Sequence, residues 1–292
     1  MKPYEPTTHI VIPDAQVKPG VPIDHLRWAM QYIVDCYAGR PNVKIICLGD
    51  FADMESLSSY DRGKKVMEGR RYAADIKAAN AAWKELNAPL DEYNKTRKQY
   101  KEKQWRPELY ITLGNHEDRI NRAINDDAKL DGTISLDDLN YARSGWNVRG
   151  YRELLWLDGV AYSHFFYNQM NGRPYGGNNI ETRLKQIGHS FTMGHQQILL
   201  YGLRYVAGRS QHGLVAGAFY MHDEDYLGPQ QAYWRGIIVK HQVENGSYDP
   251  MMVSMDYLCR RYTGKRLEVY TSKSHAPAFK DSDVPLSHLP DL

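Results

Sequence analysis

Short apolar runs alternate with helix-like and polar segments through the first half of the chain. Residues 9–13 (HIVIP), 43–48 (VKIICL) and 109–113 (LYITL) have the length and composition of buried strands. Apolar side chains recur at helical spacing over residues 22–37, and Gly39 is a suitable stop for that helix. The first half is therefore expected to alternate strands and helices.

Residues 66–103 are rich in Ala, Lys and Glu, which are strong helix formers. Proline has no amide N–H and clashes with the preceding turn, so Pro89 is expected to divide this segment into two helices. The segment lies in a basic stretch, residues 56–105, with 12 Lys or Arg and 7 Asp or Glu. Such a stretch can meet phosphate, although it is more often the solvated face of a helix.

From about residue 151 the pattern becomes that of strands. Residues 153–157 (ELLWL) and 160–166 (VAYSHFF) flank Asp158-Gly159 and predict a hairpin. A polar loop rich in Gly and Asn follows over residues 165–180. The combined pattern predicts a mixed α/β sandwich in one domain. Further strand-like runs follow at residues 191–194, 198–206, 214–221, 235–241 and 251–258.

The composition is ordinary for a soluble globular protein. Of the 292 residues, 42% are apolar and 25% are charged. No apolar run approaches the roughly 18 residues of a membrane span, and the start of the chain lacks the layout of a signal peptide. We therefore expect a cytoplasmic protein without a membrane partner. The net charge of +2 favours no class of partner, and the oligomeric state stays open.

Five of the predicted strands are followed by residues that can bind a metal ion. Sites in open α/β sheets gather beyond the carboxyl ends of the strands, and glycines at such turns allow close backbone approach. Singly, Asp50 could cap a helix and His164 could be a satisfied core histidine, but their shared position at strand ends favours one metal site. The residues at these strand ends are Asp14, Asp50, Asn115 with His116, His164, and His195.

In their order along the chain, these motifs resemble those of the calcineurin-like metallophosphoesterase superfamily. The match spans about residues 9–197 and looks like members encoded by bacteria and their phages. The matching elements are Asp14-Ala-Gln16, GDFAD from Gly49, GNHE from Gly114, the lone His164, and GHQQ from Gly194.

The resemblance implies a hydrolase acting on phosphate ester bonds, with an α/β fold. Its architecture would be a sandwich of two mixed β-sheets flanked by helices (α/β/β/α). A single domain is expected over residues 1–271, with a helical insertion at about 56–105. A loosely ordered tail is expected over residues 272–292, where the sequence is polar with scattered prolines.

The resemblance also implies a site for two metal ions. Asp50 would bridge both ions, Asp14 with two glutamines would hold the first, and the remaining ligands would hold the second. Two such ions clamp a phosphoryl group and supply a metal-bound hydroxide as nucleophile near neutral pH. The implied metal ligands are Asp14, Gln16, Asp50, Asn115, His164, His195 and Gln197.

In the same pattern, His116 would be a general acid over the scissile phosphate, and Asp53 would orient its ring. Asn115 and His116 would contact substrate. Arg173, in the loop between the fourth and fifth motifs, is a further candidate for substrate contact. Glu117 and Asp118 are expected to support the site from behind the ligands.

The chain departs from the commonest pattern at Gln16 and Gln197, where many members have histidine. Carbonyl oxygen ligands suit harder ions, so we expect Mn²⁺ at this site, with Mg²⁺, Zn²⁺, Ni²⁺ and Fe as alternatives. Met54 stands where the protein Ser/Thr phosphatase branch has an arginine, which argues against a protein phosphatase.

These features favour a phosphodiesterase that acts on nucleic acid or a nucleotide, and in the first case a nuclease. Two alternatives stay open: a phosphomonoesterase on a small metabolite, and a non-catalytic binding module whose first metal site has degraded. Aromatic residues of the second half could stack on bases, although alternating strand aromatics are more often core. These residues are Tyr201, Tyr205, Tyr220, Tyr226, Tyr233 and Trp234.

Overall fold

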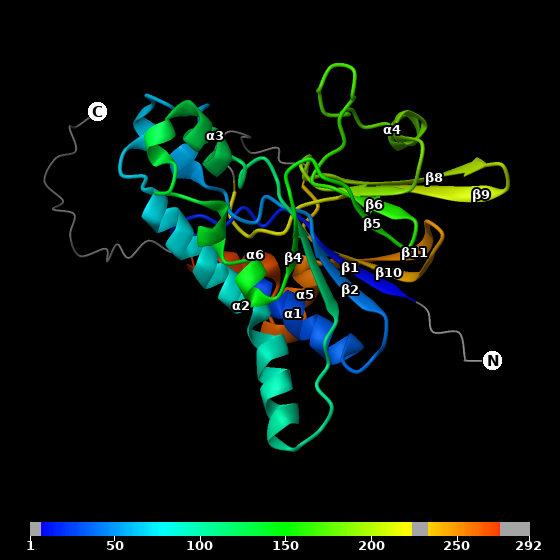
Figure 1. The fold of residues 1–292 in the computed structure, drawn as a ribbon. Coiled ribbons are helices and arrows are strands. Elements are labelled where there is room, and N and C mark those ends of the chain that lie inside the picture. Colours follow the sequence, from blue (N-terminus) through cyan, green and yellow to red (C-terminus); the bar gives the residue numbers. More distant parts are fainter. Residues whose placement is uncertain (1–6, 224–232, 275–292) are drawn as a thin grey trace, which may run out of the picture.

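The computed structural model describes residues 7–223 and 233–274, which form two β-sheets with helices on both outer faces (Figure 1). The first sheet has the order β11-β10-β1-β2-β3-β4. β1 to β4 run parallel, whereas β10 is antiparallel to both β1 and β11. These strands are β1 Thr8–Ile12, β2 Val43–Cys47, β3 Glu108–Thr112, β4 Asn147–Arg149, β10 Gly236–Glu244 and β11 Ser247–Ser254.

The second sheet has the order β5-β6-β7-β9-β8. Its three central strands run parallel, and the two outer strands are antiparallel to their neighbours. The predicted hairpin around Asp158-Gly159 is present as β5 and β6. The strands are β5 Leu155–Leu157, β6 Val160–Tyr162, β7 Phe191–Met193, β8 Leu199–Val206 and β9 Arg209–Ala216.

Helices cover the outer faces of both sheets, and short connecting helices lie between the strands (Figure 1). None of the helices within residues 7–223 and 233–274 is long and apolar enough to cross a membrane. The α-helices are α1 Asp24–Tyr37, α2 Tyr72–Gln99, α3 Arg119–Asp126, α4 Ile180–Ile187, α5 Met255–Thr263 and α6 Leu267–Ser274; 3-10 turns are Glu55–Leu57, Lys65–Met67, Ala128–Leu130, Leu136–Leu139 and Ala142–Ser144.

Neighbouring residues of β1 point into different apolar clusters, as expected for a strand buried on both faces. Ile10 packs with Leu26 of α1 and Trp83 of α2 on the outer side of the first sheet. Val11 packs with Leu214 of β9 in the layer between the sheets. On the far side of the second sheet, other β9 residues pack beneath α4. The fold is therefore an α/β/β/α sandwich of two mixed sheets, as predicted.

Pro89 does not divide the long helix, so that prediction was wrong. α2 is continuous over 28 residues with Pro89 inside it. A proline in a helix interior costs about 3 kcal/mol, but Leu86 and Leu90 on either side are buried. Burying a leucine side chain contributes about 1.5–3 kcal/mol, and α2 packs along α1. Tertiary packing therefore outweighs the local penalty.

The run at residues 251–258 is only half strand. β11 ends at Ser254, whose side chain accepts a hydrogen bond from the N–H of Tyr257 and so caps α5. β9 also lies earlier than the predicted run at residues 214–221. These shifts arise because apolar runs alone do not mark where strands stop.

Neither β4 nor α4 was predicted from the sequence. β4 is a three-residue exposed edge strand, and α4 begins at an Asn179 cap beside the Gly-rich loop. Most of the predicted tail lies outside the described residues, since α6 is described to Ser274. The domain boundaries and the insertion at about residues 56–105 stay predictions.

Lys240 of β10 is fully buried between the two sheets. Its Nζ donates hydrogen bonds to the hydroxyls of Tyr162, at 3.1 Å, and Thr192. Within the described part of the chain, no carboxylate lies within ion-pair distance of this amine. Because burial disfavours the charged form, it lowers the pKa of Lys240 well below the ordinary lysine value.

The buried amine predicts an unusual pH dependence of stability. Because the pKa of Lys240 is lower in the folded chain, the unfolded chain binds more protons at this amine, and the free energy of unfolding is expected to rise from pH 7 to pH 9. This group contributes at most about 1.4 kcal/mol per pH unit. Lys240→Met removes the ionisable group, and urea unfolding of this variant should show greater stability at pH 7 and a smaller slope.

Lys185→Met on α4 makes the same chemical change at a side chain that is 57% exposed. This control is expected to keep the wild-type slope. An unchanged slope in Lys240→Met would contradict the assignment.

Candidate functional site

The carboxyl ends of five parallel strands bring the sequence-predicted residues to one edge of the sandwich. Asp14, Asp50 and Asn115 follow the neighbouring strands β1, β2 and β3 of the first sheet. His164 and His195 follow the neighbouring strands β6 and β7 of the second sheet. The sheets stack face to face, so these two sets of strand ends meet.

Four of the predicted metal ligands adopt left-handed backbone, which is uncommon for residues other than glycine. The φ angles are 42° at Gln16, 44° at Asp50, 69° at His195 and 60° at Gln197. Such conformations cost on the order of 1–3 kcal/mol each and gather at functional sites. Here they turn the chain sharply where a strand ends, beside the other ligands.

His164 lies at the centre of a four-residue cluster. Its Nε2 lies 3.1 Å from Asp50 Oδ2, 3.0 Å from Asn115 Oδ1 and 3.3 Å from His195 Nδ1. Its Nδ1 lies 2.9 Å from the carbonyl oxygen of Leu48. A carbonyl can only accept, so Nδ1 carries a proton, and Nε2 faces the oxygens of Asp50 and Asn115 and Nδ1 of His195.

This cluster fits a metal ion. Donors that share one ion at about 2.0–2.2 Å lie roughly 3 Å from one another, as the contacts of His164 Nε2 do. The ligand atoms of Asp50, His164 and His195 all lie within 4.8 Å of one another. A backbone carbonyl behind a histidine ligand also fixes its tautomer, which is usual at metal sites.

Two glycines leave room for the carboxylates of the cluster. A Cβ on Gly114 would lie 2.1 Å from Oδ1 of Asp50, and a Cβ on Gly194 would lie 2.1 Å from Oδ1 of Asp14. No side chain fits at either position without moving a carboxylate. The glycines of the GNH and GH motifs are therefore required because the carboxylates of Asp50 and Asp14 lie so close to the backbone at these positions.

Asp14 is fully buried beside the cluster. Its Oδ2 accepts the backbone N–H of His195 at 2.9 Å, but among the described residues its Oδ1 has no hydrogen-bond partner. Burial raises the pKa of Asp14 to about 7, with the charge of Asp50 adding to the effect and His164 opposing it. A buried carboxylate oxygen without a donor is a suitable ligand for a cation.

The charges around His164 favour a cation at this position. Burial alone would lower the pKa of His164, but the carboxylates of Asp50 and Asp14 raise it to about 10. Burial, together with the charge of His164, lowers the pKa of His195 to about 4. A divalent ion would take the place of the proton that these carboxylates hold on His164.

The two glutamines are buried near Asp14, but their contacts do not define a second ion site. Gln16 donates its backbone N–H to the carbonyl of Asp50. The side-chain oxygen of Gln197 accepts from the hydroxyl of Tyr220 at 2.8 Å. Their roles as ligands stay predictions, and no motif indicated that Tyr220 would contact Gln197.

His116 and Asp53 lie together beside the cluster. His116 Nδ1 is 2.8 Å from Asp53 Oδ1, and His116 Nε2 is 3.7 Å from Asp50 Oδ2. Although burial opposes it, the charges of Asp50 and Asp53 raise the pKa of His116. The geometry suits an imidazole held for proton donation.

Sequence reasoning missed Arg119, the first residue of α3. Its Nη1 donates to the carbonyl of Asp53 at 2.7 Å and to its carboxylate at 3.1 Å, and its Nη2 lies 3.2 Å from His116 Nε2. The signal was its position three residues after His116, one helical turn further on the same face.

Arg173 lies on an exposed loop next to Pro174, which bridges to Tyr167. No contact within the described residues joins its side chain to the cluster. Its role in substrate contact stays a prediction.

Glu117 holds the site together from behind. Its fully buried carboxylate accepts backbone N–H groups from Asp50, Phe51, Ala52 and Gly114 at 2.7–3.1 Å. One side chain thus ties the turn after β2 to the turn after β3. The expected supporting role of Glu117 agrees with these contacts.

No family model matches the chain, and neither does any curated protein. Among solved structures, the chain is similar to wild-type Vps29 from Entamoeba histolytica, in its crystal structure complexed with Zn²⁺. The match covers 85% of this chain and 99% of that chain, with 11% sequence identity and a TM-score of 0.35. A likeness this low says nothing about activity, so the interpretation of the site depends on its own geometry.

Glu117→Gln is expected to destabilise the protein. A glutamine amide nitrogen cannot accept the two N–H groups that one carboxylate oxygen now accepts, and unmade hydrogen bonds of buried groups cost about 1–3 kcal/mol each. We expect the free energy of unfolding in urea to fall by about 3 kcal/mol. Glu68→Gln, at an exposed position of the same charge, should change it little; equal stability of Glu117→Gln and wild type would contradict this role.

Proposed function

We propose that this chain is a metal-dependent phosphoesterase of the calcineurin-like type that hydrolyses phosphodiester bonds in nucleic acid or nucleotides. The observation that supports this most is the cluster around His164, where carboxylate, amide and imidazole donors from both sheets lie 3.0–3.3 Å from one nitrogen. The order of the motifs along the chain resembles that of metallophosphoesterases, which favours phosphate ester hydrolysis as the reaction at that metal site.

Asp50, Asn115, His164 and His195 would hold one ion, and Asp14 would face a second one shared through Asp50. Divalent ions at these positions polarise a phosphoryl group and lower the pKa of water. We expect Mn²⁺ to serve best, because carbonyl and carboxylate oxygens make up much of the donor set.

The chain's own residues would supply the proton. His116 has Nδ1 2.8 Å from Asp53 Oδ1 and Nε2 3.7 Å from Asp50 Oδ2, and it is suited to protonate the leaving oxygen. The charge of Asp53 beside Nδ1 favours the protonated ring. Arg119 keeps Asp53 in place through its two contacts with that residue.

Removal of one ligand is the direct test of the metal centre. In calorimetric titration with Mn²⁺ and Zn²⁺, we expect His195→Ala to lower the affinity of the tightest metal site by at least about 100-fold. Mutating a residue that only hydrogen-bonds to a metal ligand already lowers metal affinity by about 10–100-fold. His241→Ala, a partly buried histidine on β10 away from the cluster, is the matched control. Equal affinity in wild type and His195→Ala would rule out this cluster as the metal site.

Hydrolysis is tested with bis(p-nitrophenyl) phosphate and p-nitrophenyl phosphate in Mn²⁺. We expect wild type to cleave the diester, and His116→Ala to lower kcat by about 10²–10⁴-fold while the bound metal content stays unchanged. Cleavage of the monoester alone would overturn the diesterase assignment. Tight metal binding without either activity would favour a non-catalytic binding module.

A further inference from the structure

A hollow of about 440 Å³ opens beside His116. One wall consists of residues already placed at the site, Gln16, Asn115 and His116. Further lining side chains come from residues 55–70, at the start of the predicted insertion. In the proposed function His116 protonates the leaving oxygen, so this hollow is where the leaving group would emerge.

Several cations of the hollow differ in how firmly they are held. Arg70 is 16% exposed and is paired with Glu55 at 3.1 Å and with Asp61 at 3.3 Å, so it closes the wall. Lys64 is 61% exposed and contacts only Asp61 among the described carboxylates, at 3.1 Å. Lys64 can therefore turn toward an anion at small cost.

Arg119 is a fixed donor on the inner wall. Its Nη1 is occupied by the oxygens of Asp53 and Met54, and its Nη2 lies 3.2 Å from His116 Nε2. Among the described residues, no carbonyl or carboxylate oxygen accepts from its Nε–H or Nη2–H groups. A guanidinium fixed in this way is prepared to bind a phosphate oxygen.

An exposed aromatic side chain stands at the rim. Tyr60 lines the hollow and is 83% exposed. A ring with both faces in water, next to cations, is typical of places where a nucleobase stacks while its phosphate is neutralised. Inorganic phosphate would contact the cations but would make no contact with this ring, whereas a nucleotide would contact both.

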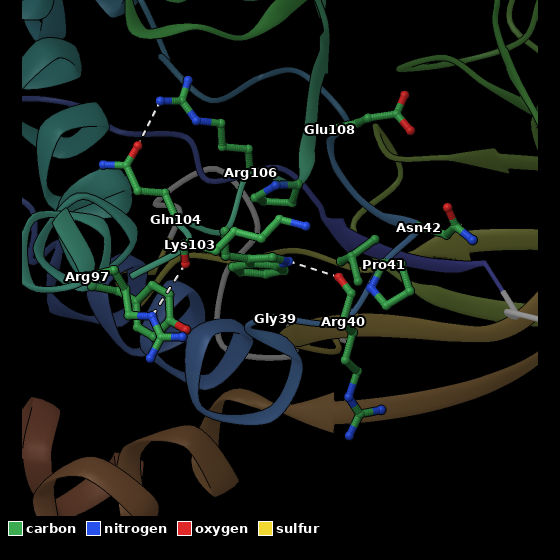
Figure 2. A pocket seen from close by; sticks show the side chains of 13 residues that line it. Gly39, Arg40, Pro41, Asn42, Arg97, Lys103, Gln104, Arg106 and Glu108 are labelled. Atoms are coloured by element: carbon green, nitrogen blue, oxygen red, sulfur yellow. Dashed lines mark hydrogen bonds between the residues drawn. The ribbon is translucent and has the colours of Figure 1, made fainter. Parts of the chain in front are cut away.

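A second cationic hollow in the described part of the chain lacks this convergence. It lies at the amino ends of β2 and β3, opposite the metal cluster, and includes Arg40, Lys103 and Arg106. Figure 2 shows that Arg40 and Arg106 point in opposite directions there. Its cations do not share one point, whereas Arg119 and Lys64 face the same space next to His116.

We propose that the hollow beside His116 binds a nucleotide leaving group, with a phosphate of that nucleotide between Arg119 and Lys64 and its base against Tyr60. This proposal rests on the proposed function and names its substrate class: a phosphodiester whose leaving nucleoside carries a further phosphate. The insertion that supplies Tyr60 and Lys64 is then the element that selects the substrate.

The test is equilibrium binding of thymidine 3′,5′-bisphosphate to the metal-free full chain at 0.15 M salt, where charges more than about 8 Å apart are screened. We expect Lys64→Glu to weaken binding about tenfold. Lys65→Glu makes the same change at the next residue, which is exposed and does not line the hollow, and should bind like wild type. Tyr60→Ala should weaken binding of the nucleotide but not of pyrophosphate.

Equal affinity in Lys64→Glu and Lys65→Glu, or no binding by wild type, would overturn the subsite. Equal binding of the nucleotide by wild type and Tyr60→Ala would overturn the nucleotide assignment. Because turnover is not needed, the proposed function is judged separately by wild-type hydrolysis of bis(p-nitrophenyl) phosphate. Nucleotide binding without that hydrolysis would sustain the subsite and refute the enzyme.

Discussion

The site depends above all on a buried carboxylate that binds no ligand, that of Glu117. It accepts four backbone N–H groups from the turns after β2 and β3. Those turns would otherwise bury unpaired amides, which is costly away from water. By tying them together, Glu117 fixes where Asp50 leaves its strand and where the GNH turn begins. The geometry around His164 follows from this anchor.

The second constraint is space and charge at the point where the two sheets meet. Gly114 and Gly194 let backbone pass within contact distance of Asp50 and Asp14, so that two carboxylates are buried close together. Two buried negative charges are tolerated only with a compensating cation. The two carboxylates on either side of His164 therefore favour the binding of a cation at this edge of the sandwich.

The site residues at strand ends, such as His164, were predictable because the residues that follow neighbouring parallel strands lie at the same edge of the sheet. Arg119 could have been considered as a site residue, since it follows His116 by one helical turn. Its residue type alone did not distinguish it from the other arginines of the chain. The prediction at Pro89 was wrong because the proline destabilises the helix locally, whereas the packing of α2 that offsets this cost is a tertiary contact. Tyr220 gave no signal, because its partner Gln197 is distant along the chain and is met only through the fold. α4 was hidden because a Gly/Asn-rich loop masks its cap.

The position of β1 between β2 and β10 has a consequence for synthesis of the chain. Every residue of the metal cluster precedes position 196, whereas β10, the partner of β1, begins only at Gly236. As the chain emerges from the ribosome, the ligands are complete while β1 is still an open edge with an apolar sequence. Such an edge invites pairing with other chains, and the long separation of β1 and β10 slows its closure. An ion captured early would hold the half-built sandwich in register until its last strands arrive.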